Sequence, residues 1–520
     1  NYIWLLSIST LTIAIVSSFH KRSAKAIAYL WISYLFAELL INQLTGLHFN
    51  LFIIETIKEQ IWSKPITALI YLIPIILIFI ILYVLTTKQQ INILKKQITV
   101  RTIPLTLTMV VTLLATQLVY AFGYYQGNLD TIRTKRQLSL LITPHPYYIK
   151  QAIQLFLNKE VGNPFSISQK LPHKERAISA PKPILNMETR PNILIIIMDS
   201  FRGKDIEKEP NIAPNITSWD NNLIFKSYNH YSTSNCTHFG LYNLLTGKLP
   251  TGFSSARRNP TLPATLDLFL QNGYQLSTSE AESLDWYDIA DTIFSGSAKR
   301  YIVSGTENID KIAIQQSIKI MKAAQLSKHP FFPLTYLDGT HFPYGNHNIS
   351  SETSLIDQYH IALKVMDQNI GEYLNTLKTS GILDNTLIIL TSDHGEEILE
   401  NGLIGHGSRL SNDQIQVPMI ILGPPGYSSK LPPPRTHTEV MPYLLSMLGI
   451  KPATTSLNQP IILANCDYDY PNGFAVIKNG KRADFIYEDG YLYNNNTSYS
   501  NTSAKEVQEA AKILIETLNR

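Results

Sequence analysis

The sequence predicts a helical transmembrane domain followed by a soluble α/β domain, whose mostly parallel central sheet carries helices on both faces. Two observations predict this fold class. Four apolar stretches precede residue 125, each close to the ~20 residues that a helix needs to cross the hydrocarbon of a membrane. After residue 190, short β-branched runs alternate with helical patterns, which implies a parallel sheet covered on both sides. Charged residues make up 16% of the 520 residues, below the usual ~25%, while hydrophobic residues make up 45%.

The net charge and the cysteine count exclude two classes of protein. A net charge of +4 is too small for a nucleic-acid-binding surface to be the main theme, so we expect no nucleic-acid partner. Two cysteines, Cys236 and Cys466, are too few for a disulfide framework or a cysteine-rich zinc module. We expect two separate thiols, and leave a Cys236–Cys466 disulfide as the alternative.

The predicted transmembrane domain covers residues 1–124. The chain begins at Asn1, and no basic region precedes the first apolar stretch, so we interpret that stretch as a helix cut at its start rather than a signal peptide. The loops that follow the first and third spans are rich in Lys and Arg, which places them in the cytoplasm and everything after the fourth span on the opposite side. We place the four spans near residues 2–18, 26–46, 66–87 and 102–124.

Residues 125–190 are predicted to form an interfacial helix and a linker. The second half of this region, 163–190, is rich in Pro, Ser and Lys, as tethers are. Its basic residues could contact anionic lipid or could form an ordinary solvated face. Both interpretations stay open at this point.

The soluble domain is predicted over residues 191–465. Asn192–Met198 is a continuous β-branched run, as expected for a central strand buried on both faces. Further strands are predicted at Phe331–Leu337, Thr386–Leu390 and Pro418–Leu422, with helices at Thr237–Thr246, Leu266–Asn272, Ile312–Ala324, Thr353–Thr379 and Glu439–Leu448. Residues 466–520 are predicted to form a β-hairpin region and a final helix, Ala504–Leu518.

Candidate metal ligands lie where predicted strands end, which is the edge at which such sheets bind ligands. Asp199 follows the first strand, and Asp393 with His394 follows Thr386–Leu390. Carboxylate oxygen and imidazole nitrogen together suit zinc, manganese or magnesium. Taken singly, Asp199 could instead cap the next helix, and Asp393-His394 could belong to a strand-end turn.

Candidate catalytic groups lie nearby in the predicted fold. Thr237 begins a helix, where free N–H groups and the helix dipole favour a bound phosphate, so it could be a nucleophile or a simple cap. His341 and His406 lie in Gly- or Pro-flanked loops, where functional groups concentrate. They could hold substrate oxygens or protonate a leaving group, or could be surface histidines.

In order along the chain, these residues resemble the alkaline phosphatase/sulfatase superfamily, over roughly residues 190–450. The resemblance rests on Asp199, on Thr246-Gly247-Lys248-Leu249-Pro250 and on Ser392-Asp393-His394-Gly395. The pattern is most similar to lipid-linked phosphoethanolamine and phosphoglycerol transferases. That resemblance implies a Thr nucleophile and one divalent metal ion, with Asp199, Thr237, Asp393 and His394 as metal ligands and Thr237, His341 and His406 as catalytic residues.

The layout of the whole chain resembles the YejM family of inner-membrane proteins. These combine a multi-span domain that carries a loop like His48-Phe49-Asn50 with a sulfatase-like periplasmic domain. The family has five spans where we place four. The resemblance implies a multi-pass protein of the bacterial inner membrane with its soluble domain in the periplasm. It also implies membrane lipids as partners, either phospholipid or lipid A, and inner-membrane regulatory proteins as further partners.

We therefore expect a membrane-anchored, metal-dependent transferase or hydrolase of phosphoesters in envelope lipids. The alternative is a non-catalytic lipopolysaccharide or lipid sensor that regulates envelope lipid homeostasis, as the best-studied YejM proteins are; Asp393-His394, which those relatives have lost, favours catalysis. A third option is a sulfatase in which Thr replaces the usual nucleophile. Cys236 lacks the Pro and Arg that follow the modified Cys of sulfatases, so formylglycine is not expected there.

Overall fold

The computed structural model describes most of the chain after residue 190. The chain divides into two compact units, Asn1–Gln169 with Asp489–Tyr493, and Lys170–Glu488 with Asn494–Arg520. The predicted spans and linker lie outside the described residues; within the described part, no helix combines the length and apolarity needed for a membrane span. The described residues are 191–518 without 221, 304–307, 343, 345–352, 426, 428–430, 450–458, 468–469, 489–490 and 496–502.

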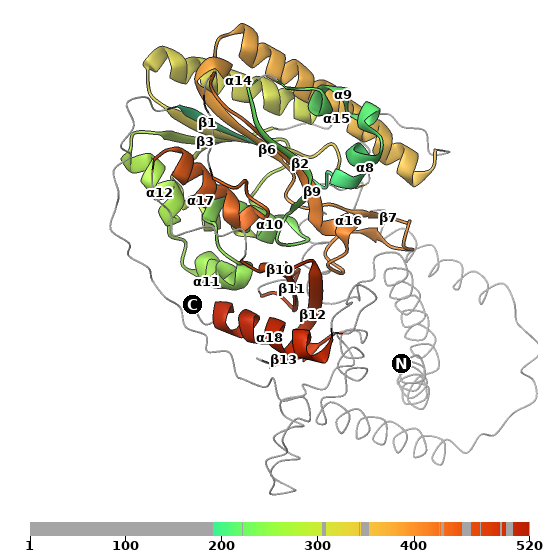
Figure 1. Ribbon diagram of the computed structural model, residues 1–520. Coiled ribbons are helices and arrows are strands. Elements are labelled where there is room, and N and C mark those ends of the chain that lie inside the picture. Colours follow the sequence, from blue (N-terminus) through green and yellow to red (C-terminus); the bar gives the residue numbers. More distant parts are fainter. Residues whose placement is uncertain are drawn as a thin grey trace, which may run out of the picture. The chain divides into compact units, whose positions relative to one another are not determined.

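A seven-stranded sheet forms the centre of the second unit, in the order β2-β9-β6-β1-β5-β3-β4 (Figure 1). The five strands β6, β1, β5, β3 and β4 run parallel to one another, and β9 is antiparallel to both β6 and β2. The prediction of a mostly parallel sheet is therefore confirmed. The strands are β1 (Asn192–Met198), β2 (Leu223–Tyr231), β3 (Gln275–Glu280), β4 (Lys299–Ile302), β5 (Phe331–Leu337), β6 (Thr386–Thr391) and β9 (Gln416–Leu422).

The central strand β1 is buried on both faces, as its unbroken apolar sequence predicts. Every residue from Ile193 to Met198 is fully buried. Leu194, Ile196 and Met198 share one core cluster with side chains of the helices on one face, while the alternate isoleucines point to the other face.

Helices cover both faces of the sheet: α14 and α15 lie on one side, and α10, α12 and α17 on the other (Figure 1). All six helices predicted after residue 190 are present, with ends that differ by three residues at most. The helices are α8 (Gly203–Lys208), α9 (Pro214–Thr217), α10 (Thr237–Thr246), α11 (Phe253–Arg258), α12 (Ala264–Gln271), α13 (Ile289–Phe294), α14 (Ile309–Ser327), α15 (Leu355–Thr379), α16 (Asn412–Ile415), α17 (His437–Met447) and α18 (Ala504–Leu518).

A second, antiparallel sheet with the order β10-β11-β12-β13 follows the main domain, and α18 packs on β11 and β12. Its strands are β10 (Ile461–Asn465), β11 (Gly473–Lys478), β12 (Lys481–Glu488) and β13 (Tyr491–Asn494). A short hairpin of β7 (Glu397–Ile398) and β8 (Ile404–Gly405) projects from the end of the main sheet.

The two cysteines form a disulfide, so the expectation of separate thiols was wrong. Cys236 and Cys466 are 230 positions apart in the sequence, and the fold brings their Cα atoms to 5.8 Å. Cys236 precedes α10 and Cys466 follows β10, so the bond joins the main domain to the second sheet. Sequence spacing alone carries no information on such a contact.

Candidate active site

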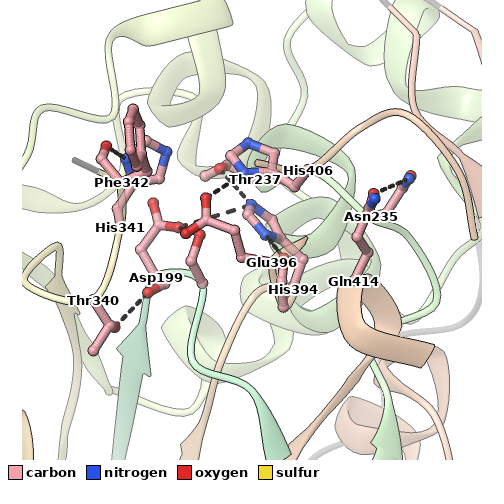
Figure 2. Close-up of polar contacts among 12 residues, drawn as sticks. Asp199, Asn235, Thr237, Thr340, His341, Phe342, His394, Glu396, His406 and Gln414 are labelled. Atoms are coloured by element: carbon pink, nitrogen blue, oxygen red, sulfur yellow. Dashed lines mark hydrogen bonds and ion pairs between the residues drawn. The ribbon is translucent and has the colours of Figure 1, made fainter. Parts of the chain in front are cut away.

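The candidate site lies at the carboxyl edge of three neighbouring parallel strands, β6, β1 and β5. Asp199 follows β1, His341 follows β5 after three residues, and Asp393 and His394 follow β6. Because parallel strands end at the same edge, residues nearly 200 positions apart meet there. Figure 2 shows Asp199, Thr237 and His394 pointing toward one another, with His341 and His406 beside them.

Thr237 is the first residue of α10 and reaches the same point from the neighbouring helix. Its Oγ1 lies 3.1 Å from Nε2 of His394, and the side chain is almost completely buried. The helix comes this close because Gly240 has no side chain: a Cβ at that position would lie 2.3 Å from the carbonyl oxygen of Asp393. The glycine one turn into the helix therefore allows Thr237 to meet the end of β6.

Asp199, Asp393 and His394 form a buried group of candidate metal ligands. One ligand atom of each lies within 4.8 Å of the others. His394 Nε2 is 3.5 Å from Asp393 Oδ2 and 3.8 Å from Asp199 Oδ1. Asp393 Oδ2 is buried and accepts no hydrogen bond. A buried carboxylate oxygen without a partner is costly, and a cation would satisfy it, so the residues present fit a divalent metal.

The tautomer of His394 supports the same fit. Its Nδ1 lies 2.9 Å from the carbonyl oxygen of Gly395, which can only accept, so Nδ1 carries the proton. Burial lowers the pKa of His394 below its ordinary value, which keeps the ring neutral. The lone pair of Nε2 then faces the oxygens of the two carboxylates, and a cation bound between them would stabilise this arrangement. The hydroxyl of Thr237 stabilises it in part by donating a hydrogen bond to Nε2.

The two carboxylates of the site differ in pKa. Burial raises the pKa of Asp199, but His341, His394 and His406, together with the hydroxyl of Tyr336, outweigh it and lower the pKa to about 2. Burial and the negative charge of Asp199 raise the pKa of Asp393 well above its ordinary value. The pKa values of two carboxylates this close move apart because a negative charge on one disfavours ionisation of the other unless a counter-charge is present.

His341 and His406 lie at the outer side of the site and are only partly buried. Their ring centroids are 5.3 Å apart, and that of His406 is 4.0 Å from His394. His406 Nδ1 lies 3.4 Å from a carboxylate oxygen of Glu396, and His341 Nδ1 donates to the carbonyl of Phe342 at 2.6 Å. Because Nδ1 of His406 faces Glu396, Nε2 is the ring nitrogen through which His406 would act on a substrate. His341, Glu396 and His406 also form a second group that could hold a metal ion.

All six residues that the sequence singled out meet in one place, while their roles remain predictions. Two supporting residues were missed. The hydroxyl of Tyr336, near the end of β5, donates a hydrogen bond to Asp199 Oδ2. The carboxylate of Glu396 accepts a hydrogen bond from the Tyr344 hydroxyl at 2.8 Å and contacts His406. A tyrosine near the carboxyl end of an otherwise apolar strand was a usable signal for the first. Glu396 lies in the Asp-His-Gly-Glu run, but its partner could be known only from the fold.

Comparison with known proteins places this geometry in a family. The family model described as Sulfatase matches residues 191–450, which is half the chain. An uncharacterized protein of Haemophilus influenzae is 26% identical over 362 residues, covering 67% of this chain and 56% of that protein. The inner membrane protein YejM of Salmonella typhimurium is 25% identical over 292 residues, covering 56% of this chain and 46% of YejM. The chain thus spans about half the length of the curated relatives it matches.

Among solved structures, the lipoteichoic acid synthase LtaP from Listeria monocytogenes is similar, with a TM-score of 0.50 and 16% identity. The similarity covers 63% of this chain and 90% of that one. At this level of identity the likeness establishes a shared fold and no more.

Proposed function

The chain belongs to the sulfatase family, and on that premise we propose that it is a membrane-anchored, metal-dependent transferase or hydrolase of phosphoesters that acts on envelope lipids. The observation that carries the proposal is the contact of the Thr237 hydroxyl with His394, at 3.1 Å, beside two buried carboxylates. A hydroxyl at a helix N-terminus next to such ligands is the arrangement of an activated nucleophile.

Asp199, Asp393 and His394 would hold the metal ion, with Thr237 next to them. A bound divalent cation would supply positive charge that lowers the pKa of the hydroxyl and stabilises charge on the transferred phosphoryl group. The free N–H groups at the start of α10 lie at the same point and suit the non-bridging oxygens of a phosphate. The ion could be zinc, manganese or magnesium, since the donor set of oxygen and imidazole accepts each of them.

The chain's own residues would carry out a two-step transfer. Thr237 Oγ1 bonds to phosphorus, the bond from phosphorus to the lipid oxygen breaks, and a phosphothreonine forms. The hydroxyl proton passes to His406, which returns it to the departing oxygen, while His341 holds a non-bridging oxygen. Water or an acceptor hydroxyl then attacks phosphorus and gives its proton to His406, the bond from phosphorus to Thr237 Oγ1 breaks, and His406 returns the proton to that oxygen.

A sequence prediction, an observed bond and the similarity to named relatives support a lipid substrate at an extracytoplasmic membrane surface. The predicted spans would confine the site near lipid headgroups, which raises the local concentration of substrate. The disulfide fits an oxidising compartment, as the periplasm is. Relatives named inner membrane protein YejM add support for an inner-membrane location.

Intact-mass measurement tests the proposal. The full chain, in vesicles of phosphatidylethanolamine and phosphatidylglycerol with labelled headgroups, is expected to gain a labelled adduct on Thr237. Thr237→Ala should lose the adduct, and Thr246→Ala, at the far end of the same helix, should keep it. Equal turnover by wild type and Thr237→Ala would show that the nucleophile is misassigned.

The second candidate is a non-catalytic lipid sensor, which the similarity to YejM favours. Metal content separates the two candidates. Stoichiometric divalent metal that is lost in Asp393→Ala and His394→Ala supports the enzyme. A metal-free protein that still binds lipopolysaccharide supports the sensor.

A further inference from the structure

One short segment of the second sheet, residues 464–467, contacts the chain on both sides of Thr237. These residues end β10 and lie more than 220 positions from the nucleophile. The contacts are a backbone bond from Ala464 N to Thr233 O at 2.8 Å, a bond from Ser234 Oγ to Ala464 O at 2.8 Å, a bond from Cys466 N to Asn235 Oδ1 at 2.8 Å, the Cys236–Cys466 disulfide, and a bond from His238 Nε2 to Asp467 O at 3.1 Å.

The loop before the nucleophile has a backbone conformation that it would not adopt alone. Thr233 has φ of 69°, in the left-handed region that a β-branched residue avoids. Its neighbours hold it there: Ser232 N donates to Ile415 O at 2.9 Å, and Thr233 O accepts from Ala464 N. Strained backbone persists only where surrounding contacts impose it, so the entry into α10 depends on the 464–467 segment.

The same segment also borders the loop that carries His406. A Cβ at Gly407 would lie 3.7 Å from the Cβ of Cys466 and 3.8 Å from its Sγ, so the backbone after His406 runs past the disulfide. Both cysteines are buried, at 1% and 3% exposure. The disulfide thus touches both sides of the site: Cys236 directly precedes Thr237, and Cys466 lies against Gly407, which directly follows His406.

We propose that the 464–467 segment is a positioning element of the active site, which holds the Thr237 hydroxyl against His394. Cys466 and Ala464 touch none of the reacting atoms; they act through the loop from Thr233 to Cys236. The second sheet is then part of the catalytic machinery rather than an appendage. This inference rests on the proposed function for its rate measurement, and it also predicts a structural change that needs no activity.

Two variants of the full chain in vesicles test the proposal. Cys236→Ala/Cys466→Ala removes the covalent link, and Ser234→Ala removes one hydrogen bond while keeping the disulfide. Lys481→Ala is the matched control, because it removes only an exposed ion pair of the same sheet with Glu506. The measurements are the rate and the apparent KM of Thr237 adduct formation, and amide hydrogen exchange.

A displaced nucleophile costs rate rather than lipid binding. We expect the double variant to form adduct about a hundredfold more slowly, as a shift on the order of 1 Å would cause, with KM unchanged. Ser234→Ala should lie between the double variant and wild type. Amides of residues 232–240 should exchange faster in both variants, while those of β1 and β6 stay protected; Lys481→Ala should match wild type throughout.

Two results would overturn the proposal. One is wild-type exchange at residues 232–240 in both variants. The other is faster exchange that extends equally to β1 and β6, because that would mean general destabilisation. If the wild-type chain forms no adduct, the proposed function fails, and hydrogen exchange still decides whether the segment positions the loop.

Discussion

Gly240→Ala is the sharpest test of how closely α10 must approach the end of β6. The added Cβ would lie 2.3 Å from the carbonyl oxygen of Asp393, where ordinary contact begins at 3.4 Å. Asp393 is anchored at the end of β6, since its Oδ1 accepts from Ser200 N at 3.3 Å and from His394 N at 2.9 Å. The helix therefore has to move by about 1 Å, and Thr237 moves with it.

The expected loss follows from that displacement. A misplacement of about 1 Å costs about a hundredfold in rate, equivalent to about 2.7 kcal/mol of activation free energy. Overpacking should also lower the free energy of unfolding by about 1–3 kcal/mol. Without the clash the substitution would stabilise the helix by up to about 1 kcal/mol, because alanine favours helix over glycine. A clash at position 240 therefore predicts that Gly240→Ala is less stable than wild type, whereas free space there predicts that it is more stable.

Single-turnover adduct formation on Thr237 and thermal unfolding measure the two effects. Gly252→Ala is the control for a methyl group added beside α10 without a backbone clash, because its Cβ would meet only the end of the Tyr242 side chain, the hydroxyl at 2.9 Å and Cζ at 3.9 Å. A Gly240→Ala protein that is as stable as wild type and fully active would refute the reasoning, since α10 would then have room that the structure denies it.

Three further predictions concern charge and proton binding. Glu396→Gln should slow adduct formation by about ten- to a hundredfold with little change in KM, because His406 loses the carboxylate that orients it. Stopped-flow kinetics of this isosteric variant measure the rate, and an unaltered rate would contradict the role of Glu396. Divalent-metal affinity should fall as the pH drops, because the raised pKa of Asp393 means that a metal must displace a proton; calorimetry at several pH values in buffers of different ionisation enthalpy should detect that proton. Burial lowers the pKa of His230 and of His238 to about 3, so both stay neutral in the folded protein but protonate in the unfolded chain below pH ~6.5. The free energy of unfolding should therefore fall by about 1.4 kcal/mol per histidine for each pH unit between 6.5 and 3. Chemical denaturation at pH 7 and pH 5 measures it, and a flat profile would contradict the burial of these rings.

The strands that hydropathy could predict are those whose burial is purely apolar. β1 and β5 were predicted with their observed bounds, because large apolar side chains dominate both: β1 is apolar from Ile193 onward, and Thr335 is the one polar aliphatic residue of β5. β3 escaped prediction because its sequence, Gln275–Glu280, is polar, yet it is buried from Leu276 to Glu280. Its Glu280 is neutralised by Arg300 of the next strand at 2.6 Å, a compensation that only the fold can supply.

The candidate site divides in the same way. The convergence of Asp199, Asp393 and His394 followed from chain order, since parallel strands end at one edge. The partners of Tyr336 and Glu396 and the disulfide pairing could not be deduced, because these contacts depend on register and on distances between segments far apart in the sequence. Local patterns identify residue types; the partners of those residues are properties of the folded chain.

The order of the three strands that carry the site has a consequence for how the site is built. Asp199 directly follows β1, which lies between β6 and β5, so the spacing of the ligand-bearing backbones is the hydrogen-bonded spacing of the sheet, about 4.8 Å per strand. Formation of the sheet thus fixes the distances between these backbones during folding, before any ion or substrate binds. Exchanging one side chain at a strand tip would alter which ion or ester is accepted, and would leave the distances between the backbones untouched.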